Sequence, residues 1–191
     1  MPATAFARAG LPRALRFEGH AIVTADGRIA DAAGGMPEAL RNAEDWRRFQ
    51  AALDASALVV LGRLGHQRHP NPGRPRLVLT ASVTAIGPDG PNATRYNPAG
   101  ASLAALLAQL GIGAGTVAVT GGTRVFDAFL PLFDAFALAE VNDLVLPYGR
   151  PCFSGGHPRA VLAAAGLRPV RIELIDPAAQ VSLTHWARPP A

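Results

Sequence analysis

Short apolar runs alternate with amphipathic segments along most of the chain. Apolar runs bounded by Gly, Pro and polar residues are typical of strands, whereas apolar positions three and four residues apart indicate helices. The predicted strands are His20–Thr24, Ala57–Leu61, Leu77–Thr80, Val117–Thr120, Ala135–Val141 and Leu144–Leu146. The predicted helices are Asn42–Leu53, Ala101–Leu110, Arg124–Leu130 and Ala160–Ala165. Asn42 is the expected capping residue of the first of them.

The end of the chain has a different pattern. Arg168–Ile175 alternates between apolar and polar residues, with Val170, Ile172 and Leu174 on one face, and we expect it to pair with Val181–Trp186 as an antiparallel hairpin. Strands that alternate with helices and then dominate predict an α/β fold. We expect three layers around a mostly parallel sheet with an antiparallel C-terminal edge.

Polar segments rich in Gly and Pro separate these elements and predict loops. They are Ala25–Pro37, Ile86–Gly100 and Gly149–Pro158. Residues 1–18 are predicted to form a loosely ordered arm or an edge segment, and residues 19–191 a single domain, a length that can bury a sizeable core.

Composition excludes several classes of protein. Hydrophobic residues make up 49% of the chain, yet no apolar run approaches the length of a membrane span. The N-terminus lacks the compact apolar region of a secretory signal. Cys152 is the single cysteine, so no internal disulfide can form, and no Cys/His cluster has metal-ligand spacing. We expect a cytoplasmic enzyme without a metal, either a monomer or a homodimer.

The net charge of +4 and the pI near 10.5 could indicate a nucleic-acid partner. All 18 basic residues are arginines, however, and they are spread along the chain without a basic run or interleaved aromatic residues. The charge therefore predicts no nucleic-acid or membrane partner. Arginines still suit anionic small molecules, because guanidinium binds phosphate and carboxylate in a bidentate way.

The segment Val117–Pro131, VAVTGGTRVFDAFLP, holds the most specific signal. A buried strand ends at Gly121 and Gly122, which lack a Cβ and let a ligand approach the backbone. The helix that follows directs its positive dipole end at the same place, and Arg124 adds charge. The corner predicts a phosphate site, and the alternative is a strand-to-helix turn without a ligand.

GGTRVFDAFLP resembles the glycine-pair segment of the dihydrofolate reductase superfamily, which includes the riboflavin-pathway pyrimidine reductases. In that family the segment holds the phosphates of NADPH. The resemblance therefore implies NADPH as cofactor and a cis peptide bond between the two glycines. The cofactor-binding residues that it implies here are Gly121, Gly122, Thr123, Arg124 and Val125.

Two further segments resemble the cofactor-binding parts of this family. VVLGR places Gly62 and Arg63 near the cofactor phosphates; Gly65 stands where the family has a threonine, and His66 is the candidate to compensate. Arg63 could instead be a solvated residue at a helix start.

The second segment is PGRPRLVLT, 72–80. It places Thr80, with the nearby Ser82, at the 2′-phosphate of NADPH. The same segment places Arg74 where the family binds the glutamate carboxylate of folate, although Arg74 also fits a simple Pro/Gly turn.

Three segments imply a substrate site. AIVTADGRIA resembles the first strand and mobile loop of the family, which puts Ala25 and Asp26 at the substrate, although Asp26 also suits a plain turn. Met36 lies where the family has Leu-Pro-Trp. In EDWRRF, Asp45 and Phe49 share one helix face at the i, i+4 spacing. Asp45 is the predicted catalytic acid, because burial would raise its pKa. Alternatively, it is a carboxylate favoured by the helix dipole.

Three positions depart from the family pattern. Ala139 stands where a threonine is usual, Glu38 replaces a tryptophan, and the loop before Phe153 lacks an aspartate. The resemblance implies an NADPH-dependent reductase of a flat heteroaromatic compound, with dihydrofolate or another pterin the first expectation. The alternatives are a riboflavin-pathway reductase, whose anionic pyrimidine substrate suits the Arg-rich loops Gly65–Arg76 and Gly149–Arg159, and a non-catalytic NADPH-binding paralogue.

Overall fold

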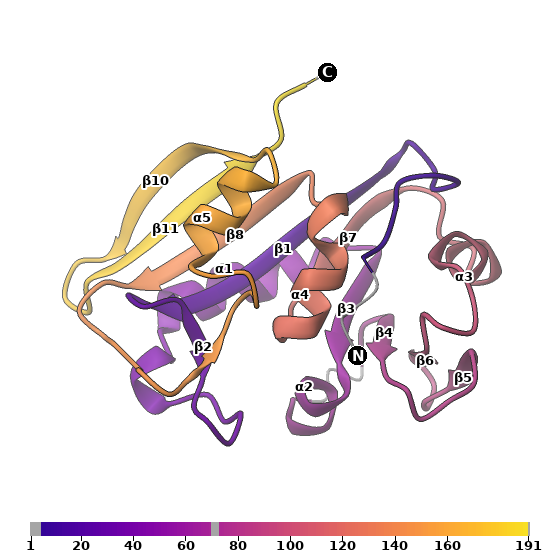
Figure 1. The fold of residues 1–191 in the computed structure, drawn as a ribbon, viewed down its shortest axis with the longest axis horizontal. Helices are drawn as coiled ribbons and strands as arrows, with labels where there is room; N and C mark the ends of the chain where they lie inside the picture. The colour runs from indigo at the N-terminus through magenta and orange to yellow at the C-terminus, as the bar shows by residue number, and fades with distance from the viewer. Residues whose placement is uncertain (1–4, 70–72, 191) are drawn as a thin grey trace.

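The computed structural model describes residues 5–69 and 73–190. Its centre is a nine-stranded sheet in the order β10-β11-β8-β1-β7-β3-β4-β6-β5, drawn in Figure 1. The strands are β1 (Leu15–Thr24), β3 (Leu58–Gly62), β4 (Arg76–Leu79), β5 (Ile86–Pro88), β6 (Ala93–Tyr96), β7 (Gly115–Val119), β8 (Ala135–Val141), β10 (Arg168–Asp176) and β11 (Val181–Ala187). β10, β11 and β8 pair antiparallel, as do β5 and β6, and the other neighbours are parallel.

Helices cover both faces of this sheet. They are α1 (Ala43–Asp54), α2 (Arg63–Arg68), α3 (Leu103–Gln109), α4 (Thr123–Phe129) and α5 (Pro158–Ala164), with short 3-10 turns at Glu38–Leu40 and Leu130–Leu132. Figure 1 shows α4 and α5 in front of the sheet and α1 behind it. Leu106, Phe126 and Leu162 bring α3, α4 and α5 into one core cluster, whereas Leu53 of α1 packs in a separate cluster with Val59.

The predicted fold class is confirmed, because the sheet is mostly parallel and ends in the antiparallel pair β10–β11. Most predicted elements lie within a few residues of the observed ones. A further two-stranded sheet, β2 (Arg28–Ala30) with β9 (Arg150–Pro151), ties together two segments that were predicted as loops. No helix in the described part of the chain is long and apolar enough to cross a membrane.

The first strand is longer than the sequence predicts. β1 begins at Leu15 rather than His20, because Leu15 and Phe17 are buried and alternate with polar neighbours. It lies inside the sheet between β8 and β7, so residues 15–18 are not an arm or an edge. Phe6, further upstream, is held by its backbone N–H, which donates to Ala128 O at 2.9 Å. Residues 1–4 of the predicted arm lie outside the described residues.

Two other predictions are wrong. The predicted loop Ile86–Gly100 contains β5 and β6, which pair with each other, and β6 also pairs with β4. The buried Tyr96 fixes the end of β6, because its hydroxyl donates to Ala101 O at 2.9 Å. The predicted strand Leu144–Leu146 is an irregular segment, because the Leu144 carbonyl and the Leu146 N–H bond to the loop after β1 instead of to a strand.

Gly19 gives the fold a sharp test. A Cβ at this position in β1 would lie 2.2 Å from the Phe136 ring, and that ring is 1% exposed and packs edge-on against Phe133. We expect Gly19→Ala to lower the free energy of unfolding by about 1–3 kcal/mol, because the packed ring cannot move away freely. Urea unfolding measures this. Gly113→Ala is the control, because a Cβ there meets nothing within 4 Å among the described residues; an equal loss in both variants would contradict the packing argument.

Candidate functional site

Two glycine segments meet where the neighbouring parallel strands β3 and β7 end. The N–H of Gly62 donates to the carbonyl oxygen of Gly121 at 2.9 Å. The Gly121–Gly122 peptide bond is cis, as the resemblance implied. Gly121 has φ +96°, and a Cβ there would lie 2.6 Å from the Phe126 ring, so glycine is required. This junction is a place where a ligand can lie directly against the backbone.

Two arginines flank the glycine junction. Arg63 is the first residue of α2, Arg124 is the second residue of α4, and both are exposed. Arg63 Nη1 donates to Gln67 at 3.0 Å within α2. Of the other predicted cofactor residues in α4, Thr123 donates its hydroxyl to Pro151 O at 2.5 Å, while Val125 is buried against the junction. The exposed cations make this end of the sheet suitable for phosphate groups.

A hydroxyl pair follows the neighbouring strand β4. Thr80 Oγ1 donates to Ser82 Oγ at 3.0 Å and accepts the Ser82 backbone N–H at 3.1 Å. Because β4 lies beside β3, and β3 beside β7, the ends of three parallel strands bring these hydroxyls to the edge that carries the glycine junction. The structure therefore gathers most predicted cofactor residues on one edge.

His66 is held by other protein groups rather than directed at the junction. Its Nδ1 lies 3.4 Å from Arg76 Nη1, and its Nε2 lies 3.3 Å from an Asp89 oxygen. Because guanidinium can only donate, Nδ1 accepts and Nε2 carries the hydrogen that points at Asp89. Gly65 serves the same short helix, since its carbonyl accepts the N–H of His69 at 2.9 Å.

Arg74 is fastened to α1. Its Nε and Nη2 donate to one carboxylate oxygen of Asp54 at 2.8 and 2.6 Å, and its Nη1 donates to Gln50 Oε1 at 2.9 Å. The side chain is 17% exposed. These bonds engage the donors that the resemblance assigns to a folate carboxylate. Pro72 of the same motif lies outside the described residues.

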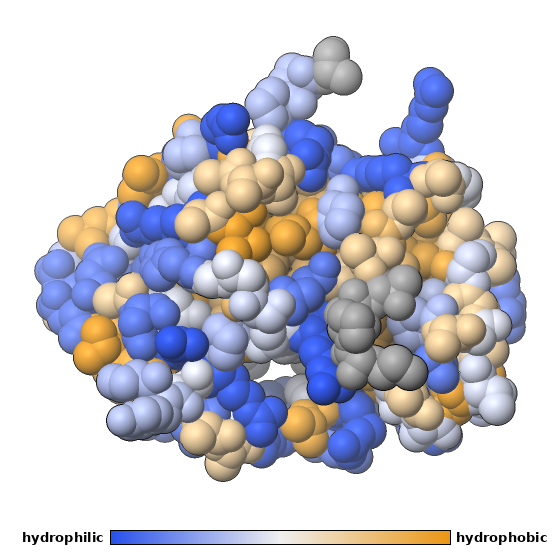
Figure 2. All heavy atoms as spheres, in the orientation of Figure 1, coloured by the Kyte–Doolittle hydropathy of each residue, from blue (hydrophilic) through white to orange (hydrophobic). Residues whose placement is uncertain are grey.

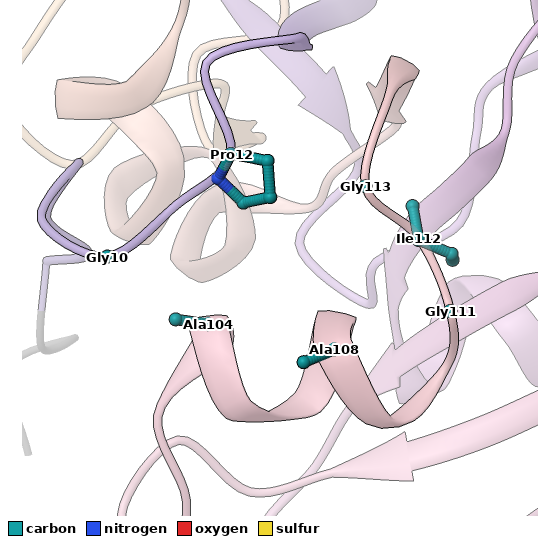
Figure 3. A pocket seen from close by; sticks show the side chains of 7 residues that line it. All are labelled: Gly10, Pro12, Ala104, Ala108, Gly111, Ile112 and Gly113. Carbon is teal, nitrogen blue, oxygen red and sulfur yellow. The ribbon is translucent and has the colours of Figure 1, made fainter.

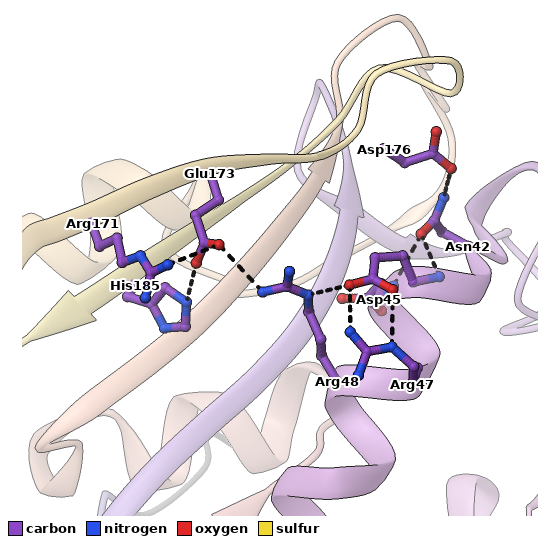
Figure 4. A network of polar contacts seen from close by, with 9 residues as sticks. Asn42, Asp45, Arg47, Arg48, Arg171, Glu173, Asp176 and His185 are labelled. Atoms are coloured by element: carbon purple, nitrogen blue, oxygen red, sulfur yellow. Dashed lines mark hydrogen bonds and ion pairs between the residues drawn. The ribbon is translucent and has the colours of Figure 1, made fainter.

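Asp45 stands in the first turn of α1, and the helix is capped by Asn42, as the sequence predicts. The side chain of Asn42 accepts the backbone N–H groups of Glu44 and Asp45 at 3.1 and 3.0 Å. Burial raises the pKa of Asp45 from 3.8 to about 6, against the opposing charge of Arg48. Glu44 contrasts with it, because hydrogen bonds from Arg47 and Arg48 lower its pKa to about 2, in the network of Figure 4.

An aromatic cluster lies on the same helix face as Asp45. The Phe49 ring centroid is 6.1 Å from that of His20 in β1 and 5.7 Å from that of Trp46. His20 is 8% exposed, and burial, reinforced by His185, lowers its pKa to about 4, so the imidazole is neutral near pH 7. Sequence reasoning missed His20; the available signal was a polar residue in an otherwise apolar strand. The cluster places aromatic surface, with rings tilted against each other, beside the half-buried Asp45.

The loop after β1 connects the two parts of the site. Asp26 organises its turn, accepting Thr24 Oγ1 at 2.5 Å and the N–H of Leu146 at 2.9 Å. Burial raises the pKa of Asp26, but these bonds outweigh it and hold the pKa below its ordinary value. Ile29 further along reaches the glycine pair, because a Cβ on Gly122 would lie 3.7 Å from its Cδ1.

Ala25 and Met36, the other predicted loop residues, are exposed. Figure 2 shows the molecule hollowed between the segment that carries β2 and the part that carries α2.

A cavity of about 330 Å³ lies elsewhere, between α3 and the N-terminal segment (Figure 3). It is lined by Gly10, Pro12, Ala104, Ala108, Gly111, Ile112 and Gly113. These residues offer no charged or hydrogen-bonding side chain, so the cavity does not resemble a reaction site. Within residues 5–69 and 73–190, no group of three His, Cys, Asp or Glu side chains could hold a metal ion.

The pKa of Asp45 predicts a stability test. Its ionised form is disfavoured in the fold, so its contribution to stability is full below about pH 4 and is lost as pH rises through about 6. We therefore expect Asp45→Asn to raise the free energy of unfolding at pH 8 by up to about 3 kcal/mol, and hardly at pH 4. Urea unfolding at both pH values measures it.

Glu44→Gln is the matched control with the opposite sign, because the lowered pKa of Glu44 stabilises the fold at neutral pH and ceases to do so in acid. If Asp45→Asn changed stability equally at both pH values, the buried-acid interpretation would be wrong.

Comparison with known proteins supports the same fold. Three solved structures resemble the chain: a diaminohydroxyphosphoribosylaminopyrimidine deaminase/5-amino-6-(5-phosphoribosylamino)uracil reductase from Thermotoga maritima (TM-score 0.65, 19% identity), a riboflavin biosynthesis protein from Shewanella sp. PV-4 (0.65, 18%), and the dihydrofolate reductase from Enterococcus faecalis complexed with NADP(H) (0.64, 18%). They cover 93%, 92% and 92% of this chain.

The chain spans 57% of the length of the Thermotoga protein, 99% of the Shewanella protein and 97% of the Enterococcus enzyme. No family model and no curated protein sequence matches it. The chain has the dihydrofolate reductase-like fold, which it shares with enzymes of both folate and riboflavin metabolism.

Proposed function

We propose that this protein is an NADPH-dependent reductase that transfers a hydride to a flat heteroaromatic substrate. The observation that carries the proposal is the junction of Gly62 with Gly121 and Gly122, at the ends of adjacent parallel strands. Ligands of open α/β sheets bind beyond the carboxyl ends of the strands. The Enterococcus relative of this fold is complexed with NADP(H), which supports the choice of cofactor.

The residues present fit such a cofactor. Gly122 is exposed and has no side chain, so a pyrophosphate can approach its backbone closely. Arg63 and Arg124 supply exposed positive charge, and the hydroxyls of Thr80 and Ser82 can meet a further phosphate. When bound, the cofactor supplies the hydride.

The residues around α1 are suited to bind the substrate and to hold a proton. The half-buried Phe49, which lies beside the neutral His20, offers a ring face on which a planar ring can stack. Asp45 is poised to bind the polar edge of that ring and to hold a proton, since its pKa of about 6 keeps part of it protonated near neutral pH. Dihydrofolate or another pterin has the planar ring and amino edge that these groups suit.

A second candidate substrate is the ribosylamino-pyrimidine phosphate of the riboflavin pathway. The bonds of Arg74 to Asp54 and Gln50 favour it, because they engage the guanidinium that would otherwise meet the carboxylate tail of folate. The buried Ala139, where the folate enzymes have a threonine, points the same way.

Oxidation of NADPH with dihydrofolate, the pyrimidine ribosyl phosphate and a quinonoid pterin offered in parallel tests the proposal. Turnover of one of them identifies the substrate class. Binding of NADPH without turnover of any compound would leave a cofactor-binding paralogue, and absence of NADPH binding would refute the proposed site.

A further inference from the structure

Strand β10 is a long, uncovered edge of the main sheet. Among the described residues it pairs with β11 on one side and with no strand on the other. Edge strands attract other strands, and proteins usually keep them short or place Pro in them. The opposite edge follows this rule, because β5 has three residues and ends at Pro88. β10 has nine residues, Arg168–Asp176, and its Pro169 lies near the start.

Three apolar side chains project from β10 into solvent. Val170, Ile172 and Leu174 are 65%, 69% and 53% exposed. Ile172 and Leu174 lie on the same face of the sheet, two residues apart. Glu173, between them, points to the other face, where it pairs with Arg48 of α1 at 3.4 Å. Exposed apolar side chains of this kind mark interaction sites, because contact with a partner removes part of their surface from water.

The charges of β10 are reversed about its central residue, Ile172. One position before it stands Arg171 and one position after it Glu173, and four positions before it stands Arg168 and four positions after it Asp176. A two-fold axis through Ile172 would therefore place each cation opposite an anion when two such strands run antiparallel. At the remaining positions the axis would place apolar residues opposite apolar residues.

We propose that β10 pairs with β10 of a second copy of this chain, antiparallel, about a two-fold axis at Ile172. The pairing joins the two sheets and brings Val170 opposite Leu174 of the partner subunit and Arg171 opposite Glu173 of the partner subunit. Such an interface is isologous, as expected of a symmetric dimer. Opposite-charge and apolar cross-strand pairs on both faces stabilise it.

Other registers are less favourable. An axis at Arg171 would set two copies of that arginine against each other, and an axis at Glu173 would do the same with two carboxylates. An axis between two residues would place charged side chains opposite apolar ones. Pro169 removes one backbone donor, and β10 is irregular against β11 between Pro169 and Arg171 and between Leu174 and Asp176. The regular centre of the proposed ladder is therefore Arg171–Leu174, which contains the axis at Ile172.

The molecular mass in solution is the first test. Sedimentation of the full chain is expected to give about twice 19.8 kDa. Ile172→Glu, which places two carboxylates at the axis, is expected to give monomers with unchanged circular dichroism, because the side chain is already exposed. The control is Val145→Glu, a similarly exposed apolar residue outside the strand, which should remain dimeric. A monomeric wild type, or a dimeric Ile172→Glu, would overturn the proposal.

Cross-linking tests the register. In Ile172→Cys the two thiols face each other across the axis, and diamide should oxidise them to an intermolecular disulfide as it takes up their two hydrogens. Val170→Cys alone should not cross-link, because its two copies would be offset by four residues, about 13 Å. A mixture of Val170→Cys and Leu174→Cys should. The native Cys152 is buried and stays unreactive. Equal cross-linking of Val170→Cys and Ile172→Cys would refute this register.

Arg171→Glu separates strand pairing from packing of the apolar faces alone. Arg171 is 67% exposed, and its ion pair is with Glu173 at 3.1 Å. In the proposed dimer the new glutamate lies opposite Glu173 of the partner subunit, so the dimer dissociation constant should rise at least 10-fold. Arg13→Glu, at an exposed position outside β10, is the control. An unchanged dissociation constant in Arg171→Glu would exclude the paired strands.

Discussion

Asp45→Asn is expected to fold and to bind NADPH while losing turnover by about 10²–10⁴-fold, the usual contribution of a positioned acid or base. Asparagine keeps the size of the side chain and cannot hold a transferable proton. It also presents a single acceptor oxygen where an ionised carboxylate presents two to an amino-substituted ring. Because Asn42 caps the helix through the backbone N–H groups of Glu44 and Asp45, replacing the Asp45 side chain removes neither capping bond.

The pH profile gives this prediction a second readout. If a protonated Asp45 supplies the proton, kcat/KM of the wild type should fall as pH rises above about 6, the pKa that burial gives this group. The Asn variant should lack that step and show a flat, low profile. Glu44→Gln, one residue earlier in the same helix turn, should keep both the rate and the profile.

Near-wild-type activity in Asp45→Asn would contradict the catalytic role. The acid would then act mainly through the helix dipole, and other carboxylates would have to be tested. Glu140 is the next candidate by position, although its carboxylate already accepts two bonds from Arg159 Nε at 2.9 and 2.8 Å. Glu38 follows, with a side chain that is 84% exposed.

Local sequence signals predicted most of the framework. The apolar run before Gly121, the i, i+4 spacing of Asp45 and Phe49, and the capping residue Asn42 all depend on contacts within a few residues, and the structure has the expected strand, helix face and cap. Ordinary periodicity can detect such features, because each is decided within one element.

The errors arise where distant segments decide the structure. Leu15 and Phe17 belong to the centre of the sheet because β7 and β8 flank them. Their alternation with Arg16 and Glu18 is visible in the sequence, but these partner strands lie far along the chain. β5 and β6 were predicted as a loop because Pro88 and Gly90 are typical turn residues, yet an edge strand tolerates them.

The candidate site likewise combines residues that local motifs predict with contacts that only distant segments decide. The partners of Arg74 are Asp54, 20 residues away, and Gln50, 24 residues away, and these contacts exist because the end of α1 lies near the start of β4. His66 is occupied by Arg76 and Asp89 for the same kind of reason. A motif can place a residue in a segment, but it does not show which neighbour uses its hydrogen-bonding groups.

The alternation in β10 was likewise visible, while its exposure was not. Period-two spacing identifies which residues share a face, but whether a helix covers that face depends on where α5 lies. In the structure α5 buries Leu162 in the core, and Ile172 and Leu174 remain in solvent.

The proposed cofactor-binding edge is expected to discriminate strongly between NADPH and NADH. Exposed Arg63 and Arg124 lie beside the glycine junction, with the Thr80–Ser82 hydroxyl pair after the next strand. Hydrogen bonds from a charged group contribute about 1.5–3 kcal/mol each, so losing one should weaken NADPH binding about 10- to 100-fold. Combining Arg63→Ala with Arg124→Ala should therefore raise the dissociation constant at least about 100-fold.

Titration of cofactor fluorescence measures these constants, and NADH provides the internal comparison. NADH lacks the 2′-phosphate, so whichever arginine binds that group should change NADPH affinity far more than NADH affinity, while an arginine at the pyrophosphate should weaken both alike. Arg13→Ala, an exposed arginine just before β1 and therefore at the opposite end of the parallel strands, should change neither. Equal affinities of the wild type for NADPH and NADH would show that the 2′-phosphate does not lie at this edge. A double variant that binds NADPH normally would show the same for all of the cofactor phosphates, because the two substitutions remove both exposed arginines beside the glycine junction.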